Sequence, residues 1–380
     1  MMPELYHNCL AGKLTHANYL LTILLIDVIQ SIKEVTLEKI AKQLQIPIKF
    51  QSRRKKIQRF LSLPEWNATA IWTPIVWEWL GGQIKGNSQI YLAIDRTQWQ
   101  SNNILMVSLI WRRRAIPLSW EVLPQLGNST FESQTTLLQA VLSKLSNYHV
   151  VVLGDREFCN VSLANWLAAQ RVDFCLRLKK NVCLEIEQDL WQQIKDLELS
   201  PGNNFFFEDV TVRKTAPIAG FNVAGKWLGK YRQIVTKEPW YIITSLSDVK
   251  LATAAYSRRF GIEEMFRDFK GGGYDLEQTN VTGLRLDRIM ILLSLAYLKS
   301  IIQGCKIKQK QVQEYLGRPT ESGRKYARHS TFHIGLWGES WVKSLLNNWN
   351  IVVELISLSP HKRLNYQQGL RAIKLTLCAL

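Results

Sequence analysis

Cysteine and histidine are both scarce in this sequence, and neither is arranged for metal or disulfide chemistry. The 380 residues include six cysteines without a C-x-x-C pair or any other paired spacing, so neither a zinc site nor a disulfide framework is indicated. Among the six histidines, His329 and His333 stand four apart, but no acidic or thiol residue lies beside them in the sequence. We therefore assign them no metal.

Long apolar runs are also missing. The two strongest, residues 19–26 and 289–298, are stopped by Asp27 and Lys299, and both are shorter than the roughly 20 residues that a membrane span needs. We interpret them as core helices. The first run also lacks the small-residue cleavage site of a signal peptide, so we expect a cytoplasmic protein that spans no membrane.

Acidic residues are few beside basic ones. The chain has 31 Asp and Glu against 48 Lys and Arg, a formal net charge of +17, which is typical of a protein that binds a polyanion. Nucleic acid is the partner that we expect, with an anionic membrane surface as the alternative. A hydrophobic content of 47% and a charged content of 21% indicate a globular protein, and the length allows two or three domains.

Residues 1–70 predict a helical DNA-binding domain. Apolar residues at positions 37, 40, 41 and 44 predict an amphipathic helix with Thr36 as its N-cap. A turn through residues 45–47 leads to a second predicted helix over residues 50–61. This succession is the layout of a helix-turn-helix.

The second of these helices is strongly basic. Six basic residues and no acidic one lie between Lys49 and Arg59. A solvated helix face is the alternative interpretation, but the rest of the chain favours contact with DNA phosphates. The residues that we expect to make this contact are Arg53, Arg54, Lys55 and Lys56.

Residues 85–180 show a different pattern, in which β-rich runs alternate with helices. The order is three strands (90–95, 103–111 and 115–122), a helix (131–145), a strand (149–155), a helix (161–170) and a strand (172–178). This is the order of a ribonuclease-H-like α/β core. We predict the first part of such a catalytic core here.

Helical periodicity is then lost over residues 181–250. Short β runs at 205–207, 210–212, 234–235 and 241–244 are separated by glycine and proline, and we predict a mostly-β domain inserted into the core. The second part of the core is expected over residues 251–320, including a long apolar helix from residue 284 to 303. Residues 321–380 predict a helical C-terminal region.

Residues 256–270 predict one helix with two distinct faces. At about 100° per residue, an apolar stripe separates from a single polar line, and Glu264 belongs to neither. The polar line consists of Tyr256, Arg259, Glu263 and Lys270. A solvated helix face with ion pairs is the alternative for such a line.

Three acidic residues stand where a metal site can form. Asp95 and Asp155 each end a predicted strand, and functional side chains of α/β sheets gather at such ends. Either aspartate alone could instead cap a turn. Together with Glu263 they supply the oxygen ligands that a pair of hard divalent cations needs to cleave a phosphodiester.

The spacing Y-(2)-R-(3)-E-(6)-K of the polar line, followed by Gly271-Gly272-Gly273, resembles the signature of bacterial insertion-sequence transposases. These enzymes cut and paste DNA with a DDE triad of acidic residues. The D-x-T segment at Asp95 and the D-R-E segment at Asp155 resemble the other two motifs of the family. The three motifs stand in the family's order, and the resemblance covers residues 30–345.

The resemblance implies roles for individual residues. Asp95, Asp155 and Glu263 would be the catalytic residues and would hold two Mg²⁺ ions, for which Mn²⁺ can substitute. Tyr256, Arg259 and Lys270 would contact the transposon end. Trp240 resembles the tryptophan that stacks on a flipped base when these enzymes form a DNA hairpin, since a large flat apolar face suits that stacking. A buried strand tryptophan is the alternative for Trp240.

The resemblance also implies an activity and its partners. The enzyme would nick the terminal inverted repeats of a mobile element, form a hairpin on each end, reopen it and insert both ends into target DNA. It would act as a homodimer that holds two ends, in the bacterial cytoplasm and at the nucleoid when bound. The alternatives are a ribonuclease-H-like structure-specific nuclease and a transposase-derived DNA-binding regulator.

Overall fold

The computed structural model describes residues 2–159, 161–214, 217–229, 238–318, 320, 322 and 328–380. The chain forms two compact units. We call them the helical unit, which comprises the residues up to Trp79 together with Asp268–Leu380, and the sheet unit, which comprises Leu80–Arg267. The boundary falls inside two helices, α5 (Thr73–Gln83) and α9 (Phe260–Phe269).

The helical unit begins with a four-helix segment that matches the predicted layout. Its helices are α1 (Glu4–Leu10), α2 (His16–Ile32), α3 (Leu37–Gln43) and α4 (Phe50–Leu61). The predicted N-cap of α3, Thr36, is the residue before the helix, and α4 has the predicted bounds. A π-helical turn over Ala68–Trp72 leads into α5.

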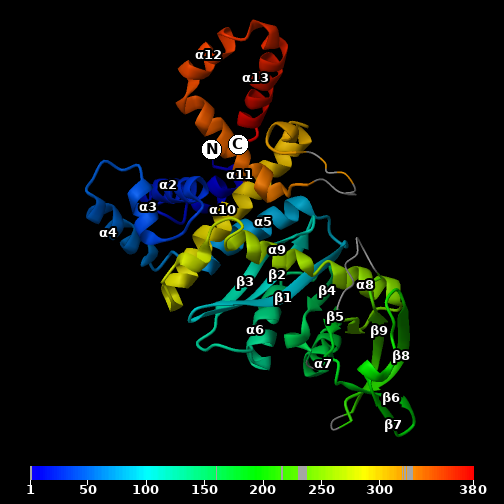
Figure 1. The fold of residues 1–380 in the computed structure, drawn as a ribbon. Helices are drawn as coiled ribbons and strands as arrows, with labels where there is room; N and C mark the ends of the chain where they lie inside the picture. The colour runs from blue at the N-terminus through cyan, green and yellow to red at the C-terminus, as the bar shows by residue number, and fades with distance from the viewer. Residues whose placement is uncertain are drawn as a thin grey trace. The chain divides into compact units, whose positions relative to one another are not determined.

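The C-terminal part of the helical unit is also helical. It contains α10 (Gly283–Gln309), α11 (Thr331–Asn347), α12 (Trp349–Ser357) and α13 (Arg363–Leu377) (Figure 1). Helices α10 and α11 approach closely through two glycines. A Cβ atom on Gly304 would overlap the carbonyl oxygen of Thr331, and one on Gly335 would overlap that of Ser300. Only glycine allows this crossing.

Helix α10 is the centre of the helical unit. Its 27 residues are long and apolar enough to cross a membrane by length and composition alone, yet 83% of its most apolar 18-residue window is buried inside the protein. The sequence argument from run length is therefore wrong. The interpretation of this run as a core helix is confirmed by its burial.

A buried cation fixes α10 to two neighbouring helices. Lys299 is fully buried, and its ammonium group donates to the Asp27 carboxylate and the Gln30 amide oxygen of α2, both at 2.7 Å. It also lies 3.2 Å from a carboxylate oxygen of Glu339 in α11. Burial by itself raises the pKa of Glu339, but Lys299 and the more exposed Lys343 reverse this and lower it. The network therefore keeps buried charges in balance.

The sheet unit is built on ten strands. They are β1 (Gln89–Trp99), β2 (Asn102–Trp111), β3 (Arg114–Val122), β4 (His149–Gly154), β5 (Asp173–Arg177), β6 (Cys183–Glu187), β7 (Leu190–Gln193), β8 (Asn204–Val212), β9 (Ile218–Lys226) and β10 (Trp240–Thr244). Their order in the sheet is β3-β2-β1-β4-β5-β10-β9-β8-β6-β7. Strand β4 is parallel to both β1 and β5, and the other described pairings are antiparallel.

Helices pack on both faces of the sheet. Helices α6 (Phe131–Leu142) and α7 (Val161–Ala169) lie together on one face, and α8 (Val249–Ser257) lies on the other (Figure 1). Two successive parallel crossovers, β1 to β4 and β4 to β5, place their helices on the same side of a sheet. Strand β4 is covered on both faces, in agreement with its continuous apolar sequence.

The region predicted to be an inserted β domain is rich in strands, as expected, but these strands extend the core sheet. Strand β10 pairs with β5 on one side and with β9 on the other. Strands β6, β7 and β9 were not foreseen in the sequence. The run predicted at residues 234–235 lies outside the described residues. The five-part division of the chain stays a prediction.

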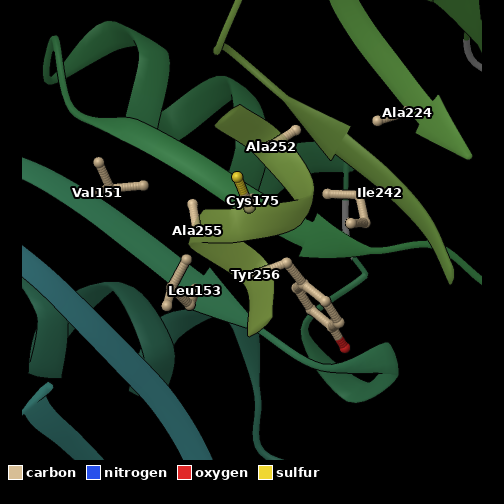
Figure 2. Packing of buried hydrophobic residues seen from close by; sticks show 8 residues of the cluster. All are labelled: Val151, Leu153, Cys175, Ala224, Ile242, Ala252, Ala255 and Tyr256. Atoms are coloured by element: carbon tan, nitrogen blue, oxygen red, sulfur yellow. The ribbon is translucent and has the colours of Figure 1, made fainter. Parts of the chain in front are cut away.

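The prediction of one continuous helix over residues 256–270 is wrong. Helix α8 ends at Ser257, a turn contains Arg258 and Arg259, and α9 begins at Phe260. Tyr256, placed on an exposed polar line by the periodicity, has an exposed fraction of 1%. It belongs to the core cluster between α8 and the sheet, and Figure 2 shows its ring at the end of α8 with the phenol oxygen directed away from the other labelled side chains.

Candidate active site

Asp95 and Asp155 lie side by side because of the parallel register of their strands. The last paired residues of β1 and β4 are Ile94 and Gly154, so the two aspartates are the next residues on adjacent strands. Asp95 does not end its strand as predicted. Strand β1 continues to Trp99, and beyond Ile94 it pairs with β2 alone. Asp95 is therefore the first residue of β1 after the pairing with β4 ends.

The backbone after each aspartate orients its carboxylate. The backbone N–H of Arg96 donates to Asp95 Oδ1 at 2.7 Å, and that of Glu157 donates to Asp155 Oδ1 at 2.8 Å. Gly154 permits the tight turn that follows β4, because a Cβ atom there would come within 2.9 Å of both Leu176 and Phe158. Each aspartate therefore keeps its second oxygen available for another partner.

Arg259 joins the third acidic residue to the first. Its Nη1 donates to Asp95 Oδ2 at 3.0 Å, and its Nη2 donates to Glu263 Oε1 on α9. The Arg259 side chain is only 8% exposed, whereas that of Glu263 is 44% exposed. The sequence placed Arg259 and Glu263 on one face, and the structure adds that the guanidinium points at the acids.

Asp95 has the most perturbed carboxyl group of the site. Its pKa is raised to about 7, mainly by burial, with the negative charges of Asp155 and Glu263 acting in the same direction and Arg259 opposing them. One arginine thus compensates only part of the charge of three acids. The site has an excess of negative charge that a cation would neutralise.

The donor set fits divalent metal ions in its chemistry. Three carboxylates are the hard oxygen ligands that Mg²⁺ prefers. Within the described residues, no three acidic, histidine or cysteine side chains lie close enough together to hold a metal ion as they stand. The Arg259 guanidinium occupies one oxygen of Asp95 and one of Glu263, so metal binding by all three acids requires Arg259 to turn away.

The aromatic residues near the acids form a small cluster. Trp240 begins β10, is half-buried, and packs edge-on against Tyr256 with ring centroids 5.1 Å apart. Phe260, which is 49% exposed, lies beyond it at 6.5 Å. The Arg259 guanidinium lies 5.6 Å from the Tyr256 ring. The buried Tyr256 ring therefore packs against both Arg259 and Trp240.

Lys270 follows the last residue of α9 and lies in the helical unit. Its ammonium group forms an ion pair with Glu277 at 2.8 Å. Its expected contact with DNA stays a prediction.

The four basic residues selected on α4 differ in their surroundings. Arg53 donates to the backbone carbonyls of Ala41 at 2.7 Å and Ile48 at 3.1 Å, so it stabilises the turn between the helices. Arg54 pairs with Glu38 of α3. Lys55 and Lys56 are exposed. These two are the best placed to contact an external phosphate.

A second basic surface adjoins the end of α4 within the helical unit. A cavity of about 480 Å³ lies between the end of α4 and the start of α10, and Arg285 and Arg288 are among its lining residues together with Asn280 and Thr282. None of the described residues that line it is acidic. Sequence reasoning missed these two arginines because they begin an apolar helix.

Part of the chain matches a known protein family. Residues 132–298 match a protein-family model described as "Transposase DDE domain". The matched region includes Asp155, Trp240, Arg259 and Glu263, while Asp95 precedes it. A search of curated proteins finds no match.

Among solved structures, the chain is similar to one described as "Cryo-EM structure of piggyBac transposase synaptic complex with hairpin DNA (SNHP)". The sequence identity is 8%, the TM-score is 0.48, and the alignment covers 88% of this chain and 72% of the other. The family match alone points to the DDE transposase class, and it does so for residues 132–298.

Proposed function

We propose that this protein is a transposase that cleaves the ends of a mobile DNA element and inserts them into target DNA. The observation that carries the proposal is the meeting of Asp95, Asp155 and Glu263 around Arg259, with two of the acids inside the region that matches a transposase DDE domain. The net charge of +17 suits a DNA partner.

The proposal includes a ribonuclease-H-like catalytic core. The sheet order β3-β2-β1-β4-β5, with β1, β4 and β5 parallel and antiparallel hairpins at one side, supports it. Two Mg²⁺ ions bound by the three acids would activate a water or a 3′-hydroxyl and stabilise the leaving oxygen. Arg259, once released from Asp95 and Glu263, can grip a DNA phosphate in two-pronged fashion.

Incubating the protein with DNA that carries the element's ends tests the proposal. With Mg²⁺ or Mn²⁺ we expect strand nicks at the ends, followed by hairpins and joined products. DNA binding without cleavage of the ends in either Mg²⁺ or Mn²⁺ would instead indicate a transposase-derived DNA-binding regulator. Cleavage guided by DNA structure and independent of end sequence would indicate the nuclease.

Trp240 is proposed to stack on a base swung out of the helix near the cut. We expect Trp240→Ala to accumulate nicked ends with few hairpins, because one lost base–aromatic stack costs about 1–3 kcal/mol, or roughly a tenfold to hundredfold loss of rate at that step. Trp240→Phe should recover part of the loss. Gel analysis of end-labelled DNA measures both products, and normal hairpin formation by a folded Trp240→Ala protein would leave this residue a packing role alone.

Helix α4 is proposed to bind DNA through its exposed lysines. Replacing Lys55 and Lys56 together by alanine should weaken DNA binding and reduce the slope of log K against log salt by about one unit for each lost phosphate contact. Fluorescence anisotropy at several salt concentrations measures this slope. Replacement of Lys195 and Lys250, two exposed lysines of the sheet unit, is the matched control, and an equal effect of both pairs would remove α4 as the binding helix.

The remaining parts of the proposal concern the oligomeric state of the protein and its location in the cell. A homodimer would hold two transposon ends in one synaptic complex, and the protein would act in the bacterial cytoplasm at the nucleoid. Cross-linking with and without end DNA tests the first point. A complex with one protomer for two DNA ends would contradict it.

A further inference from the structure

One buried ion pair joins Arg96, the residue after Asp95, to Glu157, two residues after Asp155. Arg96 Nε donates to both carboxylate oxygens of Glu157, at 3.0 and 2.8 Å. The side chains are 15% and 11% exposed. A charge-assisted hydrogen bond of this kind holds its two side chains in a defined relative position. Loss of one partner would leave an uncompensated buried charge.

The pair is anchored on both sides. Glu157 Oε1 also accepts the backbone N–H and the hydroxyl of Ser129, both at 2.9 Å. Arg96 Nη1 donates to Asn103 Oδ1 at 2.9 Å, and the Asn103 amide in turn donates to the carbonyl oxygens of Gln125 and Gly127. The loop between β3 and α6 is therefore tied to the same pair.

The pair and the acids are linked through the backbone. The N–H of Arg96 holds the Asp95 carboxylate, and the N–H of Glu157 holds the Asp155 carboxylate. Any change in the separation of Arg96 and Glu157 therefore moves both carboxylates relative to each other. The parallel pairing of β1 with β4 ends at Ile94 and Gly154, one residue before the two aspartates, so the sheet itself no longer fixes the separation of Arg96 and Glu157.

We propose that Arg96 and Glu157 are positioning residues that set the spacing of the Asp95 and Asp155 carboxylates and thereby the affinity of the site for divalent cations. The inference rests on the proposed function, because it assumes that the two aspartates bind metal. Partners that orient metal ligands typically contribute tenfold to hundredfold to metal affinity.

Titration of the purified full-length protein with Mn²⁺, with free Mn²⁺ measured by electron paramagnetic resonance, tests the inference. We expect Glu157→Gln to bind Mn²⁺ roughly tenfold to hundredfold more weakly than the wild type. Arg96→Lys keeps the charge but loses the planar guanidinium, which donates to Glu157 through Nε and to Asn103 through Nη1, so it should also bind more weakly. It serves as the second variant if Glu157→Gln does not fold.

A matched control lies at the other end of the sheet. The Asp173 carboxylate at the start of β5 accepts the Ser245 hydroxyl at 2.7 Å, and Asp173→Asn should leave Mn²⁺ affinity unchanged even where it lowers stability. Wild-type affinity in a folded Glu157→Gln protein, or an equal loss in Asp173→Asn, would overturn the positioning role. Unchanged Mn²⁺ binding in Asp155→Asn would instead refute the metal site on which the proposed function depends, and the inference with it.

Discussion

Amide replacement of any one of Asp95, Asp155 and Glu263 should abolish DNA cleavage while leaving end binding nearly intact. Each of Asp95→Asn, Asp155→Asn and Glu263→Gln keeps the shape and the hydrogen-bond acceptor of the side chain and removes one metal-binding charge. Loss of metal-assisted stabilisation is worth several kcal/mol in the transition state, so we expect rates to fall by about 10³-fold or more. End-labelled cleavage and anisotropy binding assays separate the two effects.

Glu264 provides the control for this prediction. It neighbours Glu263, but its carboxylate pairs with Arg114 and Arg267 and with neither aspartate. Glu264→Gln should therefore keep most of the cleavage activity. If Glu264→Gln were as inactive as Glu263→Gln in a folded protein, the assignment of the third acid would be wrong.

Loss of the buried ammonium group of Lys299 should strongly destabilise the helical unit. Lys299→Met leaves Glu339, which is 6% exposed, without its main buried counter-ion. Breaking a buried ion pair from one side costs about 3–5 kcal/mol. Urea unfolding followed by circular dichroism measures this loss.

Lys343 is the matched control, because it pairs with the same Glu339 carboxylate from a position that is 43% exposed. We expect Lys343→Met to cost about 0–1 kcal/mol. The double replacement Lys299→Met with Glu339→Gln should recover part of the loss, since it removes the unpaired charge. Equal effects of the two lysines would show that burial of the pair does not govern its contribution.

The sequence predicted local features of the fold correctly where the periodicity of apolar residues was the dominant signal. The alternating strand and helix pattern of residues 89–177 and the bounds of α4 follow from apolar periodicity, and the structure confirms both. Asp95 and Asp155 could be selected because each follows an apolar run. The DNA-contact and metal roles of the selected residues stay predictions.

The features that the sequence did not predict depend on contacts between distant segments. The periodicity of residues 256–270 fits one helix, but it carries no information on the turn at Arg258 and Arg259. Tyr256 looks polar in sequence, and only the packing of α8 on the sheet shows that it is buried. Likewise, pairing of β10 with β5 determines that the inserted strands extend the core sheet.

The raised pKa of Asp95 has a consequence for how the stability of the protein depends on pH. An acid whose pKa is raised in the folded state opposes folding as pH rises from its ordinary value of 3.8 to about 7, because the native state then holds more protons than the unfolded state. Above that window the native protein bears the cost of a buried charge that Arg259 offsets only in part. Asp95→Asn removes this charge while Arg259 keeps its ion pair with Glu263, so the stability of the variant should fall less than that of the wild type as pH rises through this window. Urea unfolding at several pH values measures the difference between the two proteins.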